Sequence, residues 1–213
     1  MVGDLAPGSD RRFPPSPTEL FARFRSLYDV CAADLTTELG LFYERHHKFV
    51  QYEKLLDSTR PEYLDPEWNR VFAGFLASLA REFGFVPARQ WTGEPGMVWF
   101  WPSSPTGVGV LFQEVNEATD SILTRELPEL AHDGAPLSVL IMYPDYPLAT
   151  GTSDLRESTD RWRELVQRTL TTLGLRGDFL MVTISAMSWE LPSTWAGFVW
   201  DRGSGELRPV PVV

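Results

Sequence analysis

Two hydrophobic patterns alternate along the chain. In the first, apolar residues recur every three or four positions, which predicts amphipathic helices. Helices are expected over residues 18–39, 41–56, 66–83, 120–131 and 155–173. In the second, short apolar runs lie between turns rich in glycine and proline, which predicts β-strands. Strands are expected over residues 85–91, 97–101, 108–116, 137–143, 179–185, 195–200 and 207–212.

The order of these elements predicts an α/β fold with a mixed central β-sheet flanked by helices and an N-terminal helical layer. The run 137–143 is nearly all apolar, as a central strand covered on both faces should be. Pro209 and Pro211 mark the last strand as an edge strand, because proline cannot donate a hydrogen bond to a neighbouring strand. Pro128 falls inside the expected helix 120–131 and predicts a kink or an early end there.

The chain divides into a short arm and one folded unit. Residues 1–16 hold five glycines and prolines and few apolar anchors, which favours a flexible N-terminal arm. Residues 17–213 contain no linker-like stretch and no internal repeat, so we expect a single α/β domain over this range.

Composition and charge narrow the possible functions. The chain has 213 residues and a formal net charge of -10, so a nucleic-acid-binding surface is possible but not supported by the net charge. Cys31 is the single cysteine, which excludes an intramolecular disulfide and a zinc knuckle. The sequence has no apolar run of about 18 residues that would span a membrane. It also lacks a signal-peptide pattern, so we expect a cytoplasmic protein.

Glu114 and Asn116 are the first candidates for chemistry. They occupy alternate positions of one expected strand and therefore share a face of the sheet. Glu94 lies just before the preceding strand and offers a second carboxylate. A divalent cation such as Mg²⁺ takes hard oxygen ligands and is held poorly by one carboxylate alone. A structural role is the alternative, in which Glu114 and Asn116 end a strand and Asn116 or Thr119 caps the next helix.

The stretch from residue 66 to residue 143 resembles the core of the restriction-endonuclease-like nuclease superfamily. In that family a helix leads into three strands, a further helix and a fourth strand, with an Asp after a Pro at the second strand and Glu-x-Lys on the third. Here Pro95, Gly96, Met97, Val98 and Trp99 are similar to the first phrase, and Glu114, Val115 and Asn116 are similar to the second. Gly96 stands where the Asp belongs, and Asn116 stands where the Lys belongs.

The resemblance implies a nuclease scaffold with an eroded active site. In an active member, two carboxylates hold a divalent cation that polarises the phosphate, and the lysine helps to activate water. The resemblance therefore implies a pseudo-nuclease that acts by binding without a cofactor, either to a protein partner or as an accessory, non-catalytic subunit in DNA handling or defence. An active Mg²⁺-dependent nuclease that uses Glu114 as metal ligand with a migrated carboxylate such as Glu94 is the alternative. An acidic protein-interaction module is a third reading, and the sequence does not decide whether the protein is an enzyme.

Two further groups of residues have a simpler interpretation. Four arginines of the expected helix 155–173 are interleaved with acidic residues, which predicts a solvated face with ion pairs along the helix. Eight tryptophans are many for this length, and we expect most of them to pack in the core instead of stacking on bases.

Overall fold

A computed structural model describes residues 13–26, 65–89, 96–115, 122–132, 134–144, 155–184 and 195–211. The expected helix 41–56 lies outside these residues, as do most of the N-terminal arm and the second half of the expected helix 18–39. Within the described residues the chain has an α/β architecture built on one seven-stranded sheet. The fold class expected from the sequence is confirmed at this level.

The strands of the sheet follow one another in the same order as in the chain. They are β1 Val86–Arg89, β2 Gly96–Trp101, β3 Ser104–Val115, β4 Leu137–Met142, β5 Asp178–Thr183, β6 Ala196–Asp201 and β7 Glu206–Pro209. Strands β3, β4 and β5 are parallel to one another, and the remaining pairs are antiparallel. The sheet is therefore mixed, with its parallel part in the centre, and β7 is an edge strand as Pro209 indicated.

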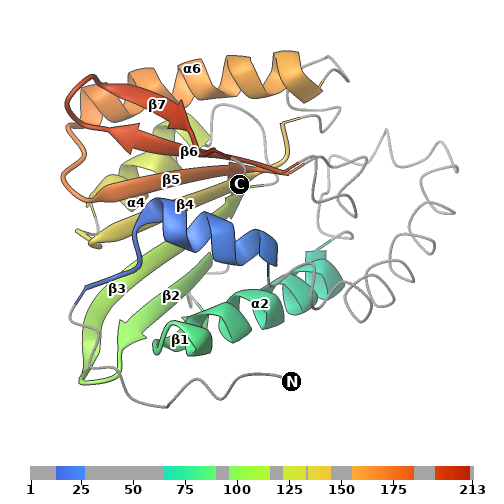
Figure 1. Ribbon diagram of the computed structural model, residues 1–213, viewed down its shortest axis with the longest axis vertical. Helices are drawn as coiled ribbons and strands as arrows, with labels where there is room; N and C mark the ends of the chain where they lie inside the picture. The colour runs from blue at the N-terminus through green and yellow to red at the C-terminus, as the bar shows by residue number, and fades with distance from the viewer. Residues whose placement is uncertain are drawn as a thin grey trace, which may run out of the picture.

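Helices cover both faces of this sheet (Figure 1). They are a helix at residues 17–26, α2 Asp65–Glu82, the π-helical turn η3 Ile122–Glu126, α4 Leu127–His132 and α6 Leu155–Leu173. The helix at 17–26 and α2 share one apolar core with the sheet, which we call the α2-side core. The other three share a second core on the opposite face, which we call the α6-side core. The molecule thus has three layers.

The clearest sequence patterns gave the most accurate boundaries. Helix α6 spans the predicted residues, and Gly174 follows it with a φ of 64°, a conformation that favours glycine. Strand β4 is buried at all six positions, as its apolar run indicated. Trp99, Trp162 and Trp195 are buried, which confirms the core interpretation for these three tryptophans.

The expectation of one helix over residues 120–131 is wrong in part. The structure has a π-helical turn, η3, followed by the short helix α4, and Pro128 is the second residue of α4. Proline has no backbone N–H and clashes with the preceding turn of an α-helix. A wider turn before Pro128 avoids that clash, so the irregularity expected at this proline takes the form of a π-helical turn.

Strand β3 begins earlier than the sequence indicated. Residues 102–107 were expected to form a turn, but β3 starts at Ser104, and Trp101 pairs with Ser104 across the hairpin. The pairing shifts near Gly109, because Trp99 pairs with Val110 and Phe100 pairs with Val108. This bulge is compatible with glycine alone, since a Cβ atom at Gly109 would lie 2.4 Å from the Phe85 ring.

The helix at 17–26 is fixed to the sheet by aromatic contacts. The Ser16 hydroxyl accepts a hydrogen bond from the Glu19 N–H, so Ser16 caps the helix. The Phe24 ring lies 4.9 Å from the Phe75 ring of α2 and 5.0 Å from the Trp195 ring, measured between centroids. An ion pair between Arg23 and Glu82 also joins the two helices. None of the helices within the described residues is long and apolar enough to cross a bilayer.

Candidate functional site

The β2–β3 hairpin carries the positions that the sequence analysis singled out. Gly96 opens β2 and pairs with Gln113 of β3. The next three pairs are Met97 with Phe112, Val98 with Leu111, and Trp99 with Val110, without interruption. Strands β2 and β3 therefore form an antiparallel hairpin, and Gly96 lies beside the end of β3 that carries Glu114.

The two cores identify which residues of the hairpin share a face. Met97 and Phe112 both belong to the α2-side core. Val98 and Leu111 both pack in the α6-side core. Directly opposite residues of an antiparallel pair lie on one face, and successive residues alternate between faces. Gly96 and Gln113 therefore belong to the α6 side of the sheet.

Glu114 is the next residue along β3 and pairs with Ile141 of the parallel strand β4. By the same alternation, position 114 lies on the same face of the sheet as positions 112 and 110. The other two candidates, Asn116 and Glu94, lie outside the described residues. Among the residues that the structure describes, no three His, Cys, Asp or Glu side chains lie together as a metal site would require. The described chain thus places Glu114 next to the Gly96–Gln113 pair but not within it.

Two buried polar side chains on this side of the sheet were missed by sequence reasoning. Glu126 ends η3 with only 3% of its surface exposed, and its carboxylate lies 3.4 Å from the Arg125 guanidinium. Thr183 ends β5 and is 1% exposed, and its hydroxyl has no hydrogen-bond partner within the described chain. The spacing of Glu126 four residues after the buried Ile122 was the available signal for Glu126.

The carboxyl ends of β3, β4 and β5 lie at one end of the sheet, because these strands are parallel neighbours. The start of β2 and the start of β6 lie at the same end, since they pair with the ends of β3 and β5. Four sequence segments adjoin these strand ends along the chain, at residues 90–95, 116–121, 145–154 and 185–194. They contain no lysine, arginine or histidine, and their acidic residues are Glu94, Glu117, Asp120, Asp145, Asp154 and Glu190. Each of these four segments therefore has a negative net charge in the sequence.

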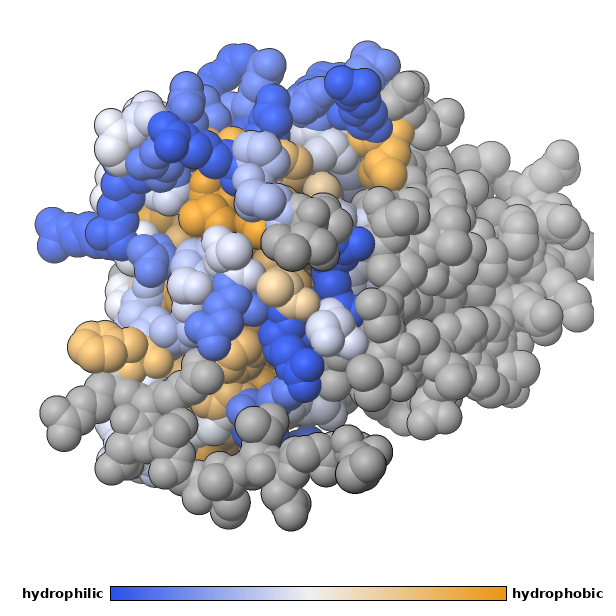
Figure 2. Space-filling model, in the orientation of Figure 1, coloured by the Kyte–Doolittle hydropathy of each residue, from blue (hydrophilic) through white to orange (hydrophobic). Residues whose placement is uncertain are grey.

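The arginines of α6 form the solvated face that was expected. Arg163 pairs with Asp160 at 3.2 Å, and Arg168 pairs with Glu164 at 3.3 Å. Figure 2 shows hydrophilic side chains gathered where α6 runs in Figure 1. Arg163 and Arg168 are thus each paired with an acidic residue of the same helix, as the interleaved charges predicted.

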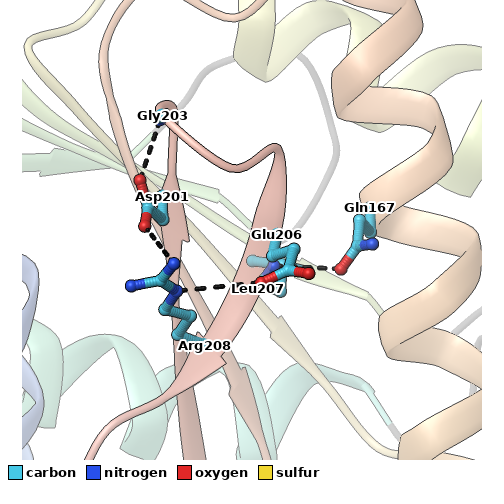
Figure 3. A network of polar contacts seen from close by, with 6 residues as sticks. All are labelled: Gln167, Asp201, Gly203, Glu206, Leu207 and Arg208. Atoms are coloured by element: carbon cyan, nitrogen blue, oxygen red, sulfur yellow. Dashed lines mark hydrogen bonds and ion pairs between the residues drawn. The ribbon is translucent and has the colours of Figure 1, made fainter.

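A polar network stabilises the C-terminal hairpin (Figure 3). Asp201 accepts a hydrogen bond from the Gly203 N–H at 2.8 Å, and its other oxygen lies 2.8 Å from the Arg208 guanidinium. The Gly203 N–H, with a smaller contribution from Arg208, lowers the pKa of Asp201 below the usual range of an aspartate. Gln167 of α6 accepts a hydrogen bond from the Leu207 N–H at 3.0 Å. This network is structural, since each member serves the turn or the sheet edge.

Comparison with known proteins gives little further information. No family model matches the chain, and no curated protein matches it. A solved structure, the carbon-nitrogen hydrolase from Helicobacter pylori G27, is similar over 92% of this chain and 80% of that chain, with 13% sequence identity and a TM-score of 0.40. A similarity this low does not inform the function of the chain.

Proposed function

We propose that this chain is a nuclease-like domain that has lost its cation-binding residues and acts by binding, as an accessory protein in DNA handling or defence. The order of elements supports this proposal. Helix α2, the antiparallel strands β1 to β3, the crossover through η3 and α4, and the parallel strand β4 follow the order that the resemblance implies.

The Gly96–Gln113 pair is the observation that carries the proposal. The resemblance implies a carboxylate at the head of β2, and Gly96 offers no side chain at all. Its partner across the hairpin is an uncharged amide. A divalent cation that activates water for phosphate cleavage needs anionic oxygen ligands, and this pair supplies none. The hairpin is therefore suited to a role without metal-dependent cleavage.

The charge of four sequence segments favours a protein partner over nucleic acid. Three of them, 116–121, 145–154 and 185–194, follow β3, β4 and β5 in the sequence, and the fourth, 90–95, precedes β2; all carry acidic residues and no basic ones. Negative charge repels the phosphate backbone and attracts a basic surface, and this attraction weakens as salt screens it. We therefore propose a partner with a basic surface, such as a DNA-binding subunit that this chain accompanies.

A cleavage assay tests the loss of activity. The full-length protein is incubated with single- and double-stranded DNA and with Mg²⁺ or Mn²⁺, beside a Glu114→Ala variant. We expect no cleavage by either protein, because neither Gly96 nor its partner Gln113 supplies a carboxylate to hold the cation. Cleavage by the wild type that disappears in Glu114→Ala would overturn the proposal and support the active nuclease.

A binding assay tests the kind of partner. Fluorescence anisotropy compares an arginine-rich peptide with duplex DNA, each at low and at high salt. We expect the peptide to bind and to dissociate as salt rises, while DNA does not bind. Glu117→Gln/Asp120→Asn should weaken peptide binding, whereas Glu164→Gln/Glu206→Gln, which removes two charges from exposed positions on α6 and β7, should not. Tighter binding of DNA than of peptide, or an equal loss in both variants, contradicts a basic protein partner.

A further inference from the structure

We infer that Gln113, and not Glu114, occupies the position that would complete a cation site with residue 96, so that a neutral amide replaces the second carboxylate. This inference rests on the proposed function, because it concerns the same eroded site. It changes the sequence-based interpretation, in which Glu114 was the surviving ligand and Gly96 its lost partner.

The register of the hairpin is the first argument. Gly96 and Gln113 begin four consecutive antiparallel pairs, and the pairing shifts only later, between Trp99 and Phe100. The bulge at Gly109 thus lies on the turn side and leaves the open end regular. In this register a carboxylate at residue 96 would share a face of the sheet with residue 113 and not with residue 114. Only a shift of the pairing by one residue would exchange the two faces.

The apolar cores give an independent second argument. They assign Met97 and Phe112 to the α2 side, and Val98 and Leu111 to the α6 side. Gly96 and Gln113 each lie two residues from a member of the α6-side pair. The cores therefore agree with the register, although they depend on side-chain packing and not on backbone pairing.

The burial of Gln113 explains why an amide suits this position. Gln113 is 5% exposed, next to the apolar side chains of the α6-side core. A buried carboxylate is costly unless a cation or another positive group compensates it. A glutamine has nearly the same shape and carries no charge. Gly96 and an amide at residue 113 therefore keep this position neutral without a cation.

Manganese binding tests this assignment directly. Binding of Mn²⁺ is measured by electron paramagnetic resonance for the wild type, Gly96→Asp, Gly96→Asp/Gln113→Glu, and the double variant with Glu114→Gln added. We expect the double variant to bind Mn²⁺ about tenfold or more tightly than the wild type and Gly96→Asp. Addition of Glu114→Gln should leave that binding unchanged. Binding by Gly96→Asp alone that Glu114→Gln removes, or no binding by the double variant, would overturn the inference.

A stability measurement covers the case in which the double variant folds poorly without metal. Gln113→Glu alone should lower the Tm by several degrees at neutral pH, and the loss should shrink as the pH falls and the buried carboxylate is protonated. In the double variant, added Mn²⁺ should raise the Tm. A Tm of Gln113→Glu that equals the wild type at every pH would contradict the inference. Cleavage of DNA by the wild type, in contrast, would overturn the proposed function and leave the register assignment in place.

Discussion

Gly197 is a residue whose missing side chain decides how two elements meet. The ring of Phe21, on the helix at 17–26, lies against this position of β6, and a Cβ atom on Gly197 would come within 2.7 Å of it. Both partners are on the α2 side of the sheet, where Phe21 is almost fully buried. The N-terminal helix therefore lies close to the sheet because the backbone of β6 is bare at this point.

Gly197→Ala should lower the free energy of unfolding by about 1–3 kcal/mol, because the added methyl group overpacks a core contact. Chemical denaturation measures this change. Gly74→Ala is the matched control, since a Cβ atom at Gly74 in α2 would meet nothing within 4 Å. Alanine stabilises a helix interior relative to glycine by about 0.5–1 kcal/mol. Equal effects of the two variants would contradict the contact between Phe21 and β6.

Asp201 should make the C-terminal hairpin sensitive to acid. The Gly203 N–H and Arg208 hold the pKa of this carboxyl below its ordinary value. A lowered folded-state pKa contributes stability above the unfolded-state pKa, and that stability is lost as the pH falls through the folded-state value. Carbon-detected NMR should show Asp201 titrating below an ordinary aspartate. Arg208→Gln should raise this pKa only in part, because the Gly203 hydrogen bond remains; a complete return to the ordinary value would contradict the order of these causes.

The register of the candidate site could not be read from the sequence. The sequence shows directly that Gly96 and Asn116 stand where the resemblance implies an Asp and a Lys. Which residue of β3 faces Gly96 depends on the length of the turn and on the bulge at Gly109, and each changes the face of every following residue. The burial of Gln113 likewise depends on how the α6 side of the sheet is covered, which the local sequence does not show.

Elements with one dominant pattern were predictable, and elements that depend on local exceptions were not. The periodic apolar positions of α6 and the uniform apolar run of β4 fixed both elements closely. The turn η3 was not predictable, because one proline changes its hydrogen bonding without changing the apolar spacing. Strand β3 was underestimated at its start, since a segment with two prolines and a glycine is typical of a turn.

Each edge strand of the sheet, β1 and β7, has at least one backbone N–H that is missing or already bonded, which limits pairing with a further strand. Edge strand β1 contains Pro87, which has no N–H to offer. At the other edge, the Leu207 N–H of β7 is occupied by the Gln167 side chain of α6. Helix α6 thus packs on the sheet and also closes part of its edge.

Gln167→Ala should destabilise the hairpin locally by about 0.5–1.5 kcal/mol, the usual contribution of one hydrogen bond. The expected signature is faster amide hydrogen exchange at Leu207, measured by NMR. Gln167→Glu keeps an acceptor oxygen at the same place and should preserve most of the protection. If both variants exchange equally fast at Leu207, the side-chain hydrogen bond is not what protects this amide.

At the scale of the whole molecule, the helix at 17–26 joins layers that are otherwise distant in sequence. Phe24 contacts Phe75 of α2 and Trp195 at the start of β6. Phe24→Ala should therefore lower the free energy of unfolding by about 3–5 kcal/mol in chemical denaturation. Phe13→Ala is the control, because Phe13 is 78% exposed and its removal should change stability by less than about 0.5 kcal/mol. Similar losses for both would show that the helix is not part of the cooperative core.

The order of the strands has a consequence for biosynthesis. Each strand pairs with its neighbour in the chain, so the sheet can grow strand by strand as the polypeptide leaves the ribosome. The contact between Phe21 and Gly197 is the exception, because Gly197 belongs to β6, the sixth of the seven described strands. The Phe21 face of the N-terminal helix therefore stays uncovered during synthesis until β6 has been made.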